Sequence, residues 1–356
     1  MIKVFLINQK KIPHYRITAY NHLSDFLKRE NYAFTIVSEG VQEGDIYPVK
    51  FDHQIISLDF INIAKLFIKE RPDVIIYWVH LRHLYLFPML LLTKILGKKS
   101  IYWGHGTDLS GKGAMKLKNI AHSTEYILSD AIILYANHLK KYIKNQFHKK
   151  TFIANNTLNF NSYKIKTEVK KDTLSKYCIT TKKNIICMGR MQRRKRIDNL
   201  LRAFNLINRP DVGLILVGPD TEGILKDIQR HNIFKLDAIY GDERLDILAA
   251  ADAFCLPGAI GLSIVDAFYC GLPIVTEAGD VSPETMFLKD GINGFVVSQG
   301  DTKKMAEKLT LLLDDDSLRE KFSKAAIKEI HTNGHIDTMC KGFSEALAFV
   351  CHNETQ

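Results

Sequence analysis

The chain has 356 residues, of which 46% are hydrophobic and 25% are charged. These values are typical of a soluble protein with two globular domains, and they exclude a disordered, collagen-like or low-complexity chain. The net charge is +10, and residues 1–170 carry 25 of the 49 Lys and Arg residues but only 13 of the 39 Asp and Glu residues.

The basic first half leaves three interpretations open. Its lysines could form an ordinary solvated surface, attract an anionic membrane, or bind a nucleic acid. We expect no nucleic-acid partner, because the sequence has no helix-turn-helix, zinc-finger or RNP pattern and the basic clusters lack interleaved aromatic residues.

The cysteines and the apolar runs bear on the compartment. None of the six cysteines has Cys-x-x-Cys spacing and no His cluster accompanies them, so we expect no metal site and reduced, buried thiols. Residues 1–7 lack a signal-peptide cleavage site, and the longest apolar run, 84–93, is too short to span a membrane. We therefore expect a cytoplasmic protein that can attach peripherally to the inner face of the membrane.

In the first half, short apolar runs alternate with segments of helical periodicity. The runs predict buried strands at 3–7, 34–37, 74–78, 100–103, 131–134 and 151–153. The periodic segments predict helices at 19–29, 61–69 and 84–96. Continuous apolar strands separated by helices indicate a parallel sheet covered on both faces, so residues 1–165 are predicted to form a doubly wound, Rossmann-like domain.

A polar stretch within 160–184 predicts the interdomain linker, after which the alternation restarts. Strands are predicted at 184–189, 213–218, 238–240, 253–256 and 273–275. Helices are predicted at 197–207, 223–231, 244–250, 261–270, 302–313 and 317–330. Residues 166–334 are therefore predicted to form a second Rossmann-like α/β domain, and we expect a last helix within 335–356 to pack back on the first domain. Ligands of such domains bind where the strands end, in a cleft between the domains.

Two loops of the second half carry candidate anion-binding groups. Gly189 to Arg196 follows a strand and holds five positive charges in seven residues, a pattern that suits a diphosphate; the alternative is an exposed basic turn. Leu256 to Ala267 joins a strand to a helix predicted to begin near Gly261, whose N-terminus would attract a phosphate. Asp266 could then accept hydrogen bonds from sugar or ribose hydroxyls, or face solvent as an ordinary early-helix acid.

Two further loops follow strands. Trp103 to Asp108 displays His105 between two glycines, although an isolated histidine is more often structural. Glu284 lies in the loop after strand 273–275, before a turn at 289–294 that leads into another strand.

Together these segments resemble the family-four glycosyltransferases, which are retaining, sugar-nucleotide-dependent enzymes of GT-B architecture. The resemblance covers nearly the whole chain and is strongest over residues 185–300. It rests on Gly189-Arg190 with Lys195, Gly261-Leu262 to Asp266-Ala267, Cys270-Gly271-Leu272-Pro273-Ile274-Val275, Ser282-Pro283-Glu284, Asp290-Gly291-Ile292-Asn293-Gly294 and His105-Gly106-Thr107-Asp108.

One position departs from the family pattern. The family has two glutamates separated by seven residues in the donor loop, where this chain has Gly258 and Asp266. The resemblance would place the first acid on the hydroxyls of the donor sugar. Backbone groups or another residue must therefore hold that sugar here.

The resemblance implies transfer of a sugar from a nucleoside diphosphate donor, UDP or GDP, to a hydroxyl of a glycan or lipid-linked oligosaccharide in surface-polysaccharide synthesis. It implies no essential metal and no permanently bound cofactor. Catalytic roles would fall to His105, Arg190 and Lys195. Donor contacts would come from Gly189, Gly258, Ile260, Gly261, Leu262, Ser263, Asp266 and Glu284, and Asp108 would lie on the acceptor side.

The basic first domain would bind the acceptor, and residues 85–90 are a candidate membrane contact unless they form a core helix. Two other functions stay open. A sugar-nucleotide epimerase also uses two Rossmann-like domains, but its catalytic acids are not evident in the first-domain loops. A non-catalytic basic protein that binds a membrane or nucleic-acid surface would act through charge alone and would show a steep salt dependence.

Overall fold

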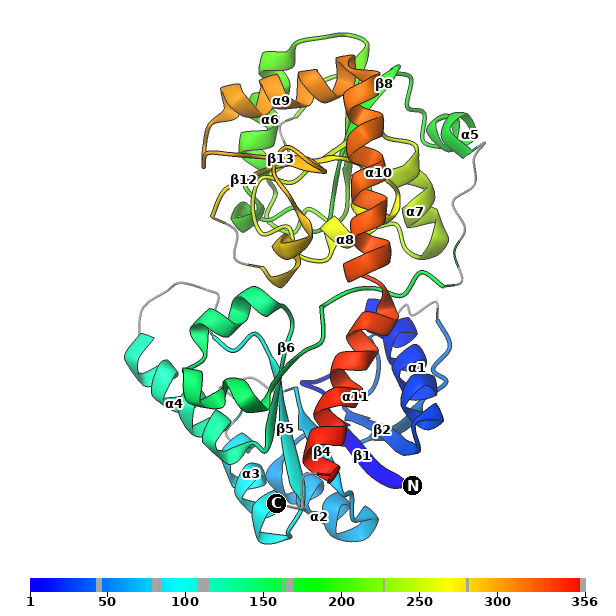
Figure 1. The fold of residues 1–356 in the computed structure, drawn as a ribbon. Coiled ribbons are helices and arrows are strands. Elements are labelled where there is room, and N and C mark those ends of the chain that lie inside the picture. Colours follow the sequence, from blue (N-terminus) through cyan, green and yellow to red (C-terminus); the bar gives the residue numbers. More distant parts are fainter. Residues whose placement is uncertain are drawn as a thin grey trace. The chain divides into compact units, whose positions relative to one another are not determined.

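The structure is a computed structural model that describes residues 1–42, 47–78, 83, 85–107, 115–161, 163, 169–226, 228–279 and 282–352. The chain forms two compact units (Figure 1). Unit 1 comprises Met1–Asn159 and His335–Gln356, and unit 2 comprises Phe160–Gly334. The first boundary thus lies at residues 159 and 160, whereas the sequence places it at 165 and 166.

Unit 1 contains a seven-stranded parallel sheet in the order β3-β2-β1-β4-β5-β6-β7. Its strands are β1 (Ile2–Ile7), β2 (Tyr32–Ser38), β3 (Asp52–Ile55), β4 (Val74–Tyr77), β5 (Lys99–Gly104), β6 (Ala131–Leu134) and β7 (Thr151–Ile153). All but β3 correspond to the predicted apolar runs. Strand β3 was missed because it is a polar, mostly exposed strand at the sheet edge.

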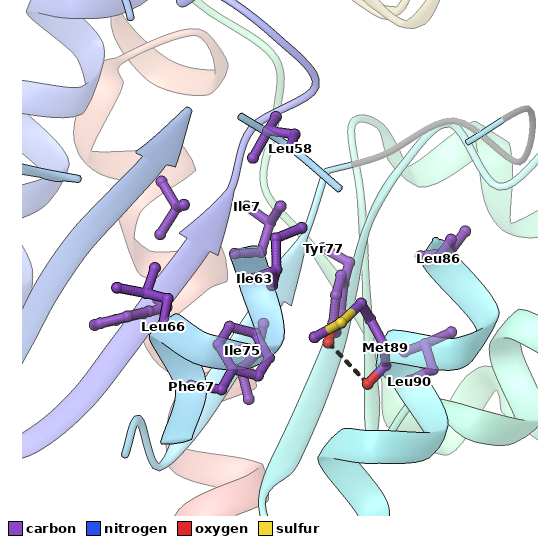
Figure 2. Packing of buried hydrophobic residues seen from close by; sticks show 12 residues of the cluster. Ile7, Leu58, Ile63, Leu66, Phe67, Ile75, Tyr77, Leu86, Met89 and Leu90 are labelled. Carbon is purple, nitrogen blue, oxygen red and sulfur yellow. Dashed lines mark hydrogen bonds between the residues drawn. The ribbon is translucent and has the colours of Figure 1, made fainter. Parts of the chain in front are cut away.

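Helices cover this sheet. They are α1 (His14–Arg29), α2 (Phe60–Glu70), α3 (Leu86–Ile95), α4 (Met115–Leu128) and α11 (Ile336–His352), with 3₁₀ segments η1 (Asn137–Tyr142) and η2 (Asn145–Lys150). Helix α4 is an addition to the helices predicted from periodicity. Figure 2 shows how α2 and α3 bury apolar side chains against the strands, where the Tyr77 hydroxyl donates to Met89 O at 3.3 Å.

The last helix, α11, packs against β6, β7 and α1. Its Phe343 ring meets Trp103 of β5 edge-on, with 4.9 Å between centroids. Gly342 lies so close to β7 that a Cβ atom there would overlap the backbone at Ile153 and Ala154. A glycine is therefore required where this helix crosses the strand.

Unit 2 contains a six-stranded parallel sheet in the order β10-β9-β8-β11-β12-β13. Its strands are β8 (Lys183–Met188), β9 (Val212–Val217), β10 (Ile233–Leu236), β11 (Ala253–Cys255), β12 (Ile274–Glu277) and β13 (Gly294–Val297). Its helices are α5 (Val169–Lys176), α6 (Ile197–Ile207), α7 (Gly241–Ala249), α8 (Ser263–Tyr269), α9 (Thr302–Asp314) and α10 (Asp316–Asn333), with 3₁₀ segments η3 (Arg193–Lys195) and η4 (Pro283–Phe287).

Two predictions for unit 2 were wrong. The segment 223–231 is not a helix in its described part; Asp220 instead accepts the backbone N–H groups of Ile224 and Leu225, which stabilises turns. The strand expected at 238–240 lies earlier in the chain, at Ile233–Leu236 (β10), because Ile233 pairs with Leu214 of β9 and sets the register. Among the described residues, no helix has both the length and the hydropathy needed to span a membrane.

Candidate functional site

The candidate site of unit 2 lies where β8, β11 and β12 end. These three strands are neighbours in the sheet, so the loops that follow them meet at one edge. The loops contain residues 189–196, 256–262 and 278–284, of which 280 and 281 lie outside the described residues. All of the unit 2 residues singled out in the sequence lie in these loops or in the helices that follow them.

Lys195 ends the short η3 segment, and its side chain folds back over the end of β8. A Cβ atom built on Gly189 would lie 2.7 Å from the Lys195 Nζ atom, so the ammonium group sits directly above this glycine. Lys195 is only 7% exposed, whereas Arg190 is exposed. The two cations predicted to bind a diphosphate therefore leave the same strand end, one buried and one in solvent.

Gly258 lies against the same turn from the β11 side. Its N–H donates to Lys195 O at 3.0 Å. A Cβ atom at this position would lie 2.6 Å from Arg194 O and 3.2 Å from Arg196 Cγ. The space that a larger residue would need is thus filled by the 194–196 segment, which explains in steric terms why this chain lacks an acid at 258.

The helix after this loop starts within two residues of the predicted position. Helix α8 begins at Ser263, Gly261 O accepts the Ile264 N–H at 3.3 Å, and Gly261 itself has a left-handed φ of +55°. The Gly261 N–H donates to Ser282 Oγ at 3.4 Å, and the Ser263 hydroxyl donates to Met188 O at 3.3 Å. Ile260 is buried, and Leu262 immediately precedes the helix. Through these contacts the loop after β11 is hydrogen-bonded both to the end of β8 and to the loop after β12.

Asp266 is buried on α8 and faces α7. Its Oδ1 atom lies 2.9 Å from Arg244 Nη2. Burial raises the pKa of Asp266, and the adjacent Arg244 opposes this shift. The carboxylate expected to meet a ribose is therefore engaged in an ion pair within unit 2. Arg244 was missed, because nothing local in 241–249 distinguishes it from a surface arginine.

Two other carboxylates lie near the strand ends. Glu284, which the sequence analysis singled out, is 4% exposed in the first turn of η4, which packs on α8. Glu277, which was missed, ends β12 and is 1% exposed. It accepts hydrogen bonds from Arg196 Nη1 at 2.5 Å and Asn199 Nδ2 at 2.8 Å. The available signal was a charged residue at the end of an otherwise apolar strand.

In unit 1, His105 follows β5 in a loop held by two tyrosines. The Gly106 N–H donates to the Tyr102 hydroxyl at 3.0 Å, and the Tyr126 hydroxyl donates to Gly106 O at 2.5 Å. The His105 ring meets the Tyr135 ring edge-on at 4.7 Å. These contacts orient the imidazole at the carboxyl end of the sheet. Asp108, the predicted acceptor-side residue, lies outside the described residues.

Buried charges surround this loop. The Arg16 guanidinium carbon lies 5.3 Å from the Trp103 ring centroid and 5.8 Å from that of Tyr135, in an aromatic cage. Next to Tyr126, burial raises the pKa of Glu125, and its contact with His122 at 3.2 Å opposes this shift. In the described part of the chain, no cluster of three or more His, Cys, Asp or Glu residues could hold a metal ion.

Sequence comparison places unit 2 among known proteins. A family model described as glycosyl transferases group 1 matches residues 170–329. A GDP-mannose-dependent monoacylated alpha-(1-6)-phosphatidylinositol monomannoside mannosyltransferase of Corynebacterium glutamicum is 30% identical over 157 residues, which is 40% of either chain. The O-antigen chain mannosyltransferase B of Escherichia coli is 30% identical over 162 residues, 41% of either chain. The matches thus span about two fifths of these relatives.

Structural comparison covers the whole chain. HepE of Anabaena, solved with UDP-glucose, has 14% identity and a TM-score of 0.77 over 98% of this chain and 100% of that one. A putative UDP-N-acetylglucosamine 2-epimerase of Listeria monocytogenes has 14% identity and a TM-score of 0.68 over 100% and 98%. The glycosyltransferase WaaG has 12% identity and a TM-score of 0.68 over 98% of this chain and 100% of that one. The predicted GT-B fold of two Rossmann-like halves is confirmed, and proteins with different functions share it.

Proposed function

We propose that this chain transfers a sugar from a nucleoside diphosphate donor to a hydroxyl of a glycan or lipid-linked acceptor, because residues 170–329 match the family model of the glycosyl transferases group 1. Unit 2 would bind the donor, and unit 1 the acceptor. The relatives named above act on phosphatidylinositol mannosides and on an O-antigen chain, which favours an acceptor in surface-polysaccharide or glycolipid synthesis.

The observation that carries this proposal is the buried ammonium of Lys195 above Gly189. Breaking the bond between sugar and diphosphate places negative charge on the leaving phosphate. A cation fixed in a water-poor site stabilises this charge without reorganising when the bond breaks. Arg190 would add a second, exposed cation with a planar fork that suits phosphate oxygens.

The remaining roles follow from the resemblance. His105 would position or polarise the donor sugar, with retention of its anomeric configuration and without a metal. The donor-loop residues from Gly258 to Ser263 would contact the donor largely through backbone groups. Asp266 would reach a ribose only by exchanging its contact with Arg244. Glu284 is the alternative carboxylate at the donor end of unit 2. UDP and GDP are the proposed nucleotides, since HepE was solved with UDP-glucose and a matched relative is GDP-mannose-dependent.

A nucleotide panel tests the proposal. We expect one of UDP, GDP, ADP, CMP and dTDP to raise the melting temperature of the purified chain, because a ligand at 100 times its Kd adds about 2.7 kcal/mol to stability. No shift at low salt with any of them would argue against a sugar-nucleotide enzyme. The matching nucleotide sugar then separates two chemistries. A transferase moves the sugar to an acceptor hydroxyl and releases the nucleoside diphosphate, whereas an epimerase isomerises the sugar of the donor and needs no acceptor.

We also propose that unit 1 attaches peripherally to an anionic membrane on the cytoplasmic side. Of the two alternatives for residues 85–90, the structure bears out the core helix, because Leu86, Met89 and Leu90 are fully buried in the core (Figure 2). The apolar side chains exposed on α3 are instead Leu91, at 51%, and Ile95, at 80%. Nearby in the sequence, Lys94 pairs with Asp130 at 3.5 Å and Lys98 with Asp73 at 3.1 Å, so these two cations are partly neutralised. The exposed aliphatic residues would therefore carry the contact, and the net positive charge of residues 1–170 the attraction to an anionic bilayer.

Vesicle sedimentation tests this attachment. We expect the chain to sediment with phosphatidylglycerol vesicles and not with neutral phosphatidylcholine vesicles. The double variant Leu91→Ser/Ile95→Ser should weaken the association at least five-fold, since it removes about 0.8 kcal/mol per buried methylene. Leu311→Ser, which alters an equally aliphatic exposed residue of unit 2, is the matched control. Equal sedimentation of both variants would exclude α3 as the contact.

A further inference from the structure

Arg196 has a backbone conformation that calls for an explanation. It has φ 52° and ψ 42°, in the left-handed region that glycine adopts at little cost and that a side chain makes unfavourable. It follows Lys195 directly and precedes α6. A residue held in such a conformation points to a compensating contact of its side chain.

That contact is Glu277. The Arg196 side chain runs past Gly258 and places Nη1 at 2.5 Å from Glu277 Oε2. The Glu277 side chain has no exposed surface, and its other oxygen accepts from Asn199 Nδ2 at 2.8 Å. Any side chain at 258 would obstruct this path, since its Cβ would lie 3.3 Å from Arg196 Nε.

The contact also fixes Lys195. On one side, Lys195 O accepts the Gly258 N–H at 3.0 Å, which joins the turn to the end of β11. On the other side, Arg196 joins the turn to the end of β12 through Glu277. The Glu277 N–H donates to Pro257 O at 3.1 Å, so the two anchors are themselves connected. The backbone around Lys195 is thus held from the ends of both β11 and β12.

We propose that Glu277 is a positioning residue that acts through Arg196 to hold the Lys195 ammonium above Gly189 for the diphosphate. The inference rests on the proposed function and deepens it. It also accounts for three features of this chain together: the absence of an acid at position 258, the left-handed backbone conformation of Arg196 and the buried side chain of Glu277. The ion pair keeps the Arg196 guanidinium directed at Glu277, so that Lys195 and Arg190 face the anion.

The double variant Arg196→Gly/Glu277→Gln tests this role. Glycine adopts the left-handed conformation readily, and glutamine can still accept the bond from Asn199, so no buried charge loses its partner and the fold should persist. We expect an unchanged melting temperature together with at least a ten-fold loss of UDP or GDP affinity in titration calorimetry. An unchanged affinity in the folded double variant would overturn the proposal.

A second readout needs no nucleotide. Brief acetylation with an N-hydroxysuccinimide ester, quantified by peptide mass spectrometry, reports the accessibility of Lys195 relative to the exposed Lys303. We expect labelling of Lys195 to rise several-fold in the double variant, and unchanged labelling would contradict the positioning role. If the wild-type chain binds none of the five nucleotides of the panel, the proposed function fails, while the labelling still decides whether Glu277 positions Lys195.

Matched variants separate position from charge. Arg194→Ala removes a cation from the same turn without touching Glu277, because the Arg194 side chain contacts Gln192 instead. We expect it to lower affinity less than three-fold; a loss equal to that of the double variant would attribute the effect to charge alone and overturn the proposal. The single variant Arg196→Lys keeps a positive charge near Glu277. It should therefore bind UDP or GDP more tightly than the double variant, although more weakly than the wild-type chain.

Discussion

Lys195→Met should lower kcat for sugar transfer by about 100-fold or more and weaken binding of the nucleoside diphosphate. The expected size follows from the loss of one preorganised donor at a developing oxyanion, which costs roughly 10²–10³ in kcat. Water cannot easily replace the ammonium, because Lys195 is 7% exposed and lies directly above Gly189. Methionine keeps the apolar stem, so the variant should fold. Released diphosphate, measured with saturating donor and acceptor, gives the rate.

Arg190→Ala and Lys303→Ala are the comparisons for this variant. Arg190 is exposed, so solvent screens its charge and the loss should be smaller than that of Lys195→Met. Lys303 lies on α9 and should give wild-type rates. Equal losses in the Arg190 and Lys195 variants would show that burial of the ammonium does not set its contribution. A wild-type rate in Lys195→Met would exclude it from the reaction.

Gly258→Ala should destabilise unit 2 by about 1–3 kcal/mol, the usual cost of overpacking, and should weaken nucleotide binding as well. The new Cβ would lie 2.6 Å from Arg194 O, a backbone atom that cannot turn aside. The turn must therefore move, and Lys195 would move with it because its carbonyl accepts the Gly258 N–H. Urea denaturation, monitored by the far-UV circular dichroism of the backbone, measures the loss in free energy of unfolding.

Gly258→Glu is the informative companion, since it restores the acid that the family resemblance would place there. We expect it to be less stable than Gly258→Ala and inactive, because the longer side chain would also meet Arg196. Ala259→Gly is the control at the adjacent position; its φ of +32° predicts an equal or slightly higher stability with glycine. A stable and more active Gly258→Glu variant would contradict this packing argument.

Much of the fold could be predicted from local pattern. Apolar runs such as those at β4 and β8 are long enough for a strand and too uniformly apolar for an amphipathic helix. Such runs are typical of a parallel sheet that is buried on both faces. The failures occurred where pairing decided the outcome. β3 is a polar edge strand, and β10 lies at Ile233–Leu236 because β9 offers partners there. Neither choice is encoded within the segment itself.

The site divides in the same way. The sequence by itself determined which loops follow the strand ends of unit 2 that the structure brings to one edge of the sheet, because strand ends, glycines and clustered cations can be recognised within a few residues. It identified Lys195, Gly189 and Arg190 in this manner. It also marked Gly258 as a departure from the family pattern, but not its reason. The choice of loops needed only the rule that parallel strands present their ligands at their carboxyl ends, whereas the departure at Gly258 needed the family resemblance.

Only the tertiary structure decided which charges meet. Arg196 and Glu277 are 81 residues apart, and Asp266 lies on α8 while its partner Arg244 lies on α7. Such pairs depend on the strand order β8-β11-β12, in which β9 and β10 leave the sequence order and are placed on the far side of β8. An ion pair requires atoms within about 4 Å, and local periodicity carries no information on that distance once the chain has crossed between strands.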